Sequence, residues 1–227
     1  MRRLLITLVL CLIALPVLAH DPSIEGDEDW GGFDAPNRVA DATISYALYG
    51  YLDEGDIDVF RLDFEDEENL LRVELLVPVC GDHYADFYPQ FAVFSTNTRA
   101  ADSELAAVSF PFDVPEELHA VYVSDTPEAT LEARPTFVEP IGGTAYYDSP
   151  RLDLDVPRGT YLIAVYAPDG VRSGDYTIAT GYREVFNSPP GETLAEVITI
   201  RANAWLHRDC DLAPDDPNAM ITPEHVD

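Results

Sequence analysis

The chain has 227 residues, of which 42 are acidic and 13 are basic, giving a formal net charge of −29. Nucleic acids and anionic membrane surfaces are bound by neutralising phosphates with basic side chains, so this composition excludes both classes of partner. A hydrophobic fraction of 47% is sufficient for a buried core, and the length is typical of one domain.

The first 19 residues have the pattern of a secretory signal peptide. Arg2 and Arg3 precede the apolar run Leu4–Leu15, and small residues follow as far as Ala19. The run is shorter than the roughly 20 residues that cross a bilayer, so we expect export and cleavage after Ala19 rather than anchoring. The mature chain is then secreted or periplasmic, has no stable membrane insertion, and carries a net charge of −31 because two arginines are lost.

Two cysteines, Cys80 and Cys210, remain after this cleavage. In an oxidising compartment they are expected to form a disulfide, which restricts the unfolded chain by up to about 5 kcal/mol in the loop-entropy model. A metal-binding pair and two free thiols are the alternatives.

The mature chain divides into four parts. Residues 20–36 are an acidic leader without a periodic apolar face, and residues 37–186 contain the predicted strands. Residues 187–208 include an apolar stripe and a capping-box pattern that predict a short C-terminal helix. Residues 209–227 are an acidic, proline-containing tail.

Apolar and polar residues alternate with period two in several short segments separated by turn signals, which is typical of strands with one face toward a core. The expected strands cover residues 44–48, 60–64, 71–77, 91–94, 119–123, 151–156, 160–167 and 176–185. So many short strands predict an all-β fold, an antiparallel jelly-roll-like β-sandwich with a short C-terminal helix. Prolines in residues 95–150 leave the strand order there undetermined.

Two pairs of segments carry a resemblance to a known family. Leu48–Leu52 followed by Gly55–Phe60 resembles the opening of bacterial pre-peptidase C-terminal domains, and Gly159–Val165 with Ser173–Ile178 is similar to their last two strands. The resemblance implies a secreted, non-catalytic accessory β-sandwich that in some members binds calcium and in others adheres to protein or glycan.

The chain has no GxSxG, HExxH, P-loop or glycine-rich dinucleotide motif. We therefore expect a non-catalytic binding or structural module, with an extracellular glycan or protein as the partner.

Acidic residues gather at predicted turns, where their oxygens are the ligands that calcium takes. The clusters are Asp21–Asp29, Asp53–Asp58 and Glu65–Glu68, and within the second one Asp53, Asp56 and Asp58 are the candidate calcium ligands. A solvated acidic surface, which also suits high salt, is the alternative.

The stretch after Cys80 combines aromatic and polar side chains in a predicted loop. Its candidate ligand-binding residues are Asp82, His83, Tyr84, Asp86, Phe87 and Tyr88. Loops commonly carry function, and a disulfide at the base of this one would preorganise it. The alternative is that the rings cover one end of the core.

Cleavage after Ala19 would make His20 the first residue. An α-amino group and imidazole on one residue can chelate copper together with a second histidine, for which His83, His119 and His207 are candidates. A copper-dependent oxidative enzyme is thus the alternative function.

Overall fold

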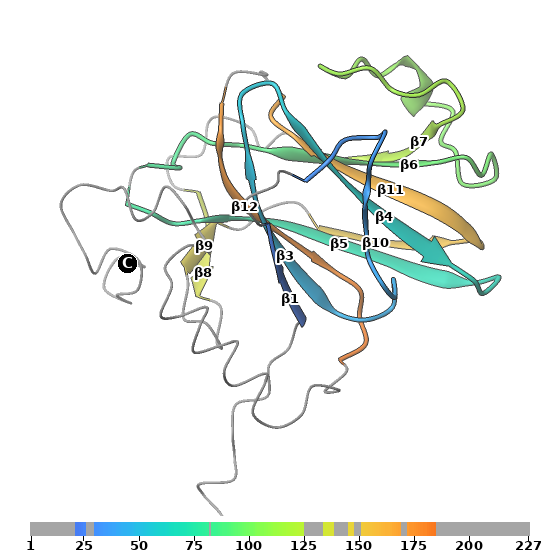
Figure 1. The fold of residues 1–227 in the computed structure, drawn as a ribbon, viewed down its shortest axis with the longest axis horizontal. Coiled ribbons are helices and arrows are strands. Elements are labelled where there is room, and N and C mark those ends of the chain that lie inside the picture. Colours follow the sequence, from blue (N-terminus) through green and yellow to red (C-terminus); the bar gives the residue numbers. More distant parts are fainter. Residues whose placement is uncertain are drawn as a thin grey trace, which may run out of the picture.

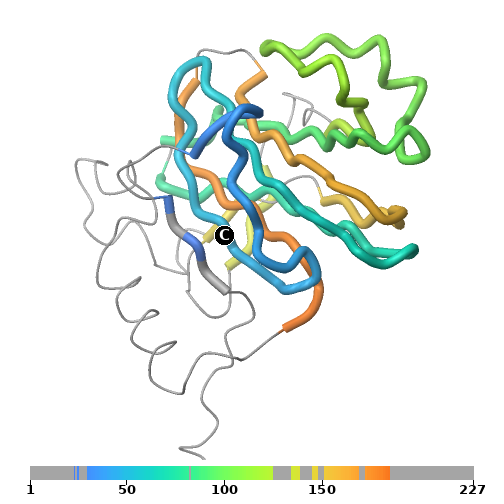
Figure 2. The backbone as a smooth tube through the Cα atoms, turned by 45° about the vertical axis from the view of Figure 1, so that its right-hand side comes forward, coloured from blue at the N-terminus to red at the C-terminus, as the bar shows by residue number. Residues whose placement is uncertain are grey.

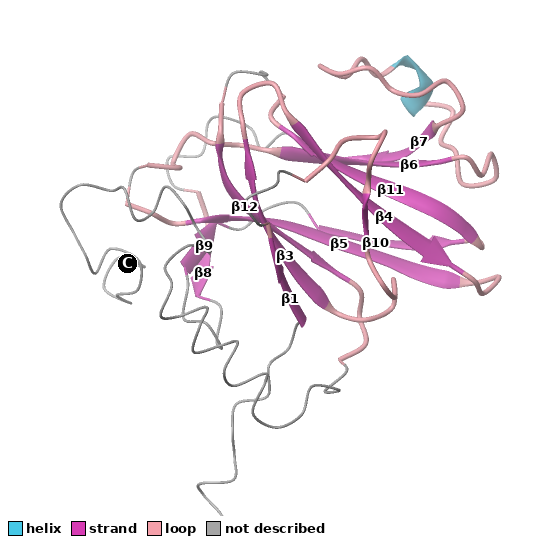
Figure 3. Ribbon diagram, in the orientation of Figure 1, coloured by secondary structure: helices cyan, strands magenta, loops and turns pink. Residues whose placement is uncertain are grey.

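The computed structural model describes residues 21–25, 30–81, 83–124, 134–138, 145–147, 151–168 and 172–184. The described residues form strands and loops with one short 3-10 helix (Figure 3). The strands are β1 (Asp21–Ile24), β2 (Asn37–Arg38), β3 (Tyr46–Leu52), β4 (Ile57–Phe64), β5 (Asn69–Pro78), β6 (Gln90–Ser95), β7 (His119–Val123), β8 (Thr136–Val138), β9 (Ala145–Tyr147), β10 (Arg151–Val156), β11 (Gly159–Tyr166) and β12 (Gly174–Thr180), and the helix is η1 (Leu105–Ala107). The predicted signal peptide, C-terminal helix and acidic tail lie outside the described residues.

The strands form two sheets (Figure 1). The five-stranded sheet has the order β2-β4-β11-β6-β7, and the seven-stranded sheet has the order β1-β3-β12-β5-β9-β8 with β10 also paired to β5. Most pairs are antiparallel, whereas β1 and β2 join β3 and β4 in parallel. The all-β sandwich that the sequence predicts is therefore confirmed.

The inner core lies between the sheets and consists of alternate residues of their strands. On β11, Tyr161, Ile163 and Val165 belong to this core. Leu162, Ala164 and Tyr166 belong instead to a second cluster on the outer face of the five-stranded sheet. Both faces of this sheet are consequently buried along β11 and β6.

Four strands of the structure were not predicted from the sequence. β1 and β2 lie in and just after the acidic leader, and β8 and β9 lie in the proline-containing region. They are short, and period-two alternation needs more residues than these to be visible. No helix among the described residues has the length and apolarity to cross a membrane.

The predicted strand over residues 176–185 is too long at its end, because β12 stops at Thr180. Gly181 follows with a φ of 77°, and a Cβ built there would lie 1.9 Å from the carbonyl oxygen of Ile44. Only glycine fits this close approach in this conformation, so the backbone turns away here.

The two sheets are joined through the core by a polar contact. The Tyr176 hydroxyl on β12 donates a hydrogen bond of 2.6 Å to Oδ2 of Asp58 on β4, and both residues are buried. Burial, reinforced by the Asp58 carboxylate, raises the pKa of Tyr176 well above its ordinary value of 10.0. The phenol therefore stays protonated in the folded protein.

We predict that Tyr176→Phe lowers the free energy of unfolding by roughly 1–3 kcal/mol at neutral pH, because the buried Asp58 carboxylate loses the hydrogen bond from Tyr176. Urea unfolding measures this, with Tyr182→Phe as the control, since Tyr182 is 43% exposed. The wild type should also lose stability as the pH rises above about 10, where the unfolded chain releases a proton that folded Tyr176 keeps. Equal unfolding midpoints for Tyr176→Phe and the wild type would contradict this role.

Candidate functional site

A second hydrophobic cluster covers the outer face of the five-stranded sheet. Its buried side chains lie on β4, β6 and β11, and its partly buried ones come mainly from the segment before β2 and the long loop before β7. Figure 2 shows this long loop, coloured green, beside the strands. Five rings, which we call the aromatic cluster, are Phe33, Phe94, Phe110, Phe112 and Tyr166.

The rings of the aromatic cluster contact one another directly. Phe110 stacks on Phe112 with a centroid distance of 5.3 Å, and Phe112 meets Tyr166 edge-on at 5.1 Å. Phe33 meets Phe94 edge-on at 5.5 Å. Each such pair contributes about 0.5–1.5 kcal/mol beyond its buried area, so the two loops are held on the sheet by their own side chains.

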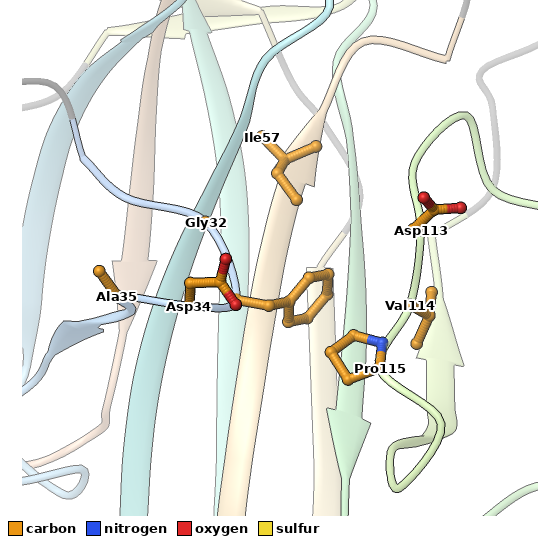
Figure 4. Close-up of a pocket in the computed structure, with 8 residues that line it drawn as sticks. Gly32, Asp34, Ala35, Ile57, Asp113, Val114 and Pro115 are labelled. Carbon is orange, nitrogen blue, oxygen red and sulfur yellow. The ribbon is translucent and has the colours of Figure 1, made fainter.

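A groove remains where these two loops approach each other. It encloses about 480 Å³ and is lined by Gly32, Phe33, Asp34, Ala35, Ile57, Asp113, Val114 and Pro115. Figure 4 shows Asp34 and Ala35 on one side and Asp113, Val114 and Pro115 on the other, with Ile57 between them along the groove.

Backbone contacts fix the first side of the groove. The Val59 amide donates to the Gly31 carbonyl at 3.0 Å, and the Ala35 amide closes a turn on the Gly32 carbonyl at 3.2 Å. A Cβ at Gly31 would lie 2.5 Å from the Ala35 carbonyl oxygen, so this tight turn requires glycine.

Two carboxylates, those of Asp34 and Asp113, give the groove its charge. Both residues are exposed, and neither takes part in an ion pair among the described residues. By contrast, arginines pair with Asp63, Asp86 and Asp153 elsewhere on the surface. The groove therefore combines an apolar floor with uncompensated negative charge.

The sequence did not identify the groove as a site. The pattern Phe110-Pro111-Phe112 lies in the region where no regular strand was predicted, and Phe33 lies in the leader. The only signal in the sequence was that these aromatic residues lie outside the predicted strands. Nothing in the sequence showed that Phe33 packs in the same cluster as Phe110 and Phe112.

The structure places the rings of the predicted ligand-binding loop mostly in the core. Tyr84 and Phe87 are nearly fully buried, and the Tyr84 hydroxyl donates to Oδ2 of Asp175 at 2.8 Å. Neither ring offers a surface to a ligand, which corresponds to the alternative that the rings cover one end of the core. Burial of large aromatic area explains the outcome.

Other residues of this loop lie at the surface and contact neighbouring side chains. His83 and Asp86 are exposed; the His83 ring packs 4.6 Å from that of Tyr84, and Asp86 pairs with Arg172. Cys80 is buried and disulfide-bonded. Asp82 and Cys210 lie outside the described residues, so the Cys80–Cys210 pairing stays a prediction.

Arg134 clamps this loop. Its Nη1 donates to the Phe87 carbonyl at 2.8 Å, and its guanidinium carbon lies 4.5 Å from the ring centroids of both Tyr88 and Tyr147. Burial lowers the pKa of Arg134 from its ordinary value. The half-buried Tyr88 is therefore part of a cation–π sandwich that fixes the loop.

The candidate metal ligands stay predictions. Among the described residues no group of three or more His, Cys, Asp or Glu side chains could hold a metal ion. Asp53 is exposed, whereas Asp58 lies in the core and accepts from Tyr176. His20, the candidate copper ligand, lies outside the described residues, so its pairing with His83 stays a prediction.

Comparisons with known proteins give distant structural likeness only. No family model and no curated protein matches the chain. Among solved structures, the chain is similar to Aeromonas hydrophila PliG, a periplasmic inhibitor of g-type lysozyme, with 14% identity and a TM-score of 0.38, covering 72% of this chain and 100% of that one. It is also similar to Salmonella Typhimurium PliG, another such inhibitor, with 11% identity and a TM-score of 0.31, covering 65% of this chain and 98% of that one.

We predict that Arg134→Ala speeds hydrogen exchange of the loop amides over residues 83–88 and lowers the free energy of unfolding by roughly 1–3 kcal/mol. Arg158→Ala is the matched control, because Arg158 is exposed and its side chain has no ion pair among the described residues. Exchange measured by mass spectrometry should then change only in the first variant. Unchanged exchange in the loop would show that the clamp does not hold it.

Proposed function

We propose that the mature chain is a secreted or periplasmic, non-catalytic binding module, and that the groove beside the aromatic cluster is its binding surface. The main observation in support is a concave space with an apolar floor, which lies between two loops that are both fixed on the sheet. The predicted signal peptide supports export.

The volume of the groove is typical of a binding site, whereas its lining is more polar than usual, with apolar and polar surface in similar amounts. Binding sites are typically clefts of roughly 300–1,000 Å³, largely apolar, with a few polar groups that set orientation. Phe33, Ile57, Val114 and Pro115 supply the apolar part, and two carboxylates supply the polar part.

Rigidity is the second support for binding. The aromatic cluster is assembled before any partner arrives, so little conformational entropy is lost when the groove is filled. A partner gains affinity by covering apolar area that the two loops leave open.

A protein partner is favoured over a neutral glycan. The side chains that line the groove offer apolar surface and carboxylate oxygens, which accept hydrogen bonds, but no side-chain donor. Basic polypeptide segments present apolar stems together with cationic donors, whereas a neutral glycan offers donors without charge. The clamped loop, with His83 and Asp86 exposed, is a second surface that such a partner could contact.

We predict that Ala35→Trp, which fills the groove from its exposed edge, weakens retention on a peptide array by about tenfold or more, equivalent to about 1.4 kcal/mol. The melting temperature should stay within about 2 °C of the wild type, because Ala35 is exposed. The matched control is Ala106→Trp on η1, which is also exposed and lies outside the groove.

Equal retention of both variants and the wild type would refute the groove as the binding surface. Turnover of an array component by the wild type would refute the non-catalytic assignment.

A further inference from the structure

We propose that the groove receives an arginine or lysine side chain from a basic segment of another protein, held between Asp34 and Asp113. This inference rests on the proposed binding function and specifies its partner. It follows from three features of the groove: its charge, its aromatic lining and the field around it.

The charge of the groove comes from two different parts of the chain. Asp34 belongs to the turn before β2 and Asp113 to the loop before β7, and they lie on opposite sides of the same space (Figure 4). A cation in this space would be attracted by both carboxylates, and a guanidinium or an ammonium has several donors with which to pair with carboxylate oxygens.

The chain does not supply this cation among its described residues. It contains no lysine, and the described ion pairs of its arginines involve Asp41, Asp63, Asp86 and Asp153. Among the described residues, therefore, neither groove carboxylate has a cationic partner.

The floor of the groove suits the remainder of a basic side chain. Arginine and lysine carry apolar stems, which can lie along Ile57, Val114 and Pro115. Phe33 also lines the groove, and the face of an aromatic ring attracts a cation. An apolar peptide without a cation would leave the carboxylates uncompensated.

The field of the whole chain favours the same partner. With a net charge of −29 before signal cleavage, the protein attracts a basic protein over long range and repels an anionic glycan. This long-range attraction acts on any polycation. The test must therefore distinguish binding in the groove from non-specific attraction to the whole chain.

The test uses a fluorescein-labelled peptide of alternating glycine and arginine, with a citrulline version as its neutral counterpart. Asp34→Asn/Asp113→Asn should weaken binding of the arginine peptide roughly 3- to 10-fold, as expected for two exposed ion pairs. Glu65→Gln/Glu67→Gln removes the same charge from exposed residues at the far end of β4 and should change binding less than about twofold.

The outcomes separate the inference from the proposed function. If Ala35→Trp abolishes peptide binding while the two charge-neutralised variants behave alike, the groove binds but the cation assignment is wrong. The cation assignment is also wrong if the citrulline peptide binds as well as the arginine peptide. It is likewise wrong if a neutral glycan occupies the groove. If Ala35→Trp and Asp34→Asn/Asp113→Asn both bind as the wild type does, both proposals fail.

Discussion

The outer face of the five-stranded sheet is apolar along β6 and β11, and this constraint shapes the rest of the molecule. β6 is buried along its whole length, and β11 is buried from Tyr161 onward. Phe94 and Tyr166 would expose large apolar areas if nothing lay over them. Apolar burial is the dominant favourable contribution to folding, so the chain must supply a cover.

The cover consists of two loops that are distant in sequence. Phe33 comes from one and Phe112 from the other, and both belong to the aromatic cluster. Because each loop is fixed by its own rings and turns, the loops approach without fusing into one layer, and the groove is the space between them. The carboxylates of the groove belong to Asp34 and Asp113, which directly follow Phe33 and Phe112 in the sequence.

Sequence reasoning predicts what depends on local pattern. β4, β5, β10 and β11 follow from period-two alternation, and the sandwich follows from the number of short strands. The loop after Cys80 shows where such reasoning ends: the sequence allows Tyr84 either to face a ligand or to cover the core, and only the tertiary contact with Asp175 places it in the core. The groove could not be predicted, because its two sides meet through long-range packing that no short-range pattern encodes.

The claim that the groove is the binding surface is tested most directly by mapping amide chemical shifts of the labelled protein while the arginine–glycine peptide is added. The largest shifts should fall on the amides of residues 32–35, Ile57, Asp113 and Val114, which line the groove. Shifts concentrated on residues 83–88, with the groove amides unchanged, would contradict it and return the binding site to the clamped loop.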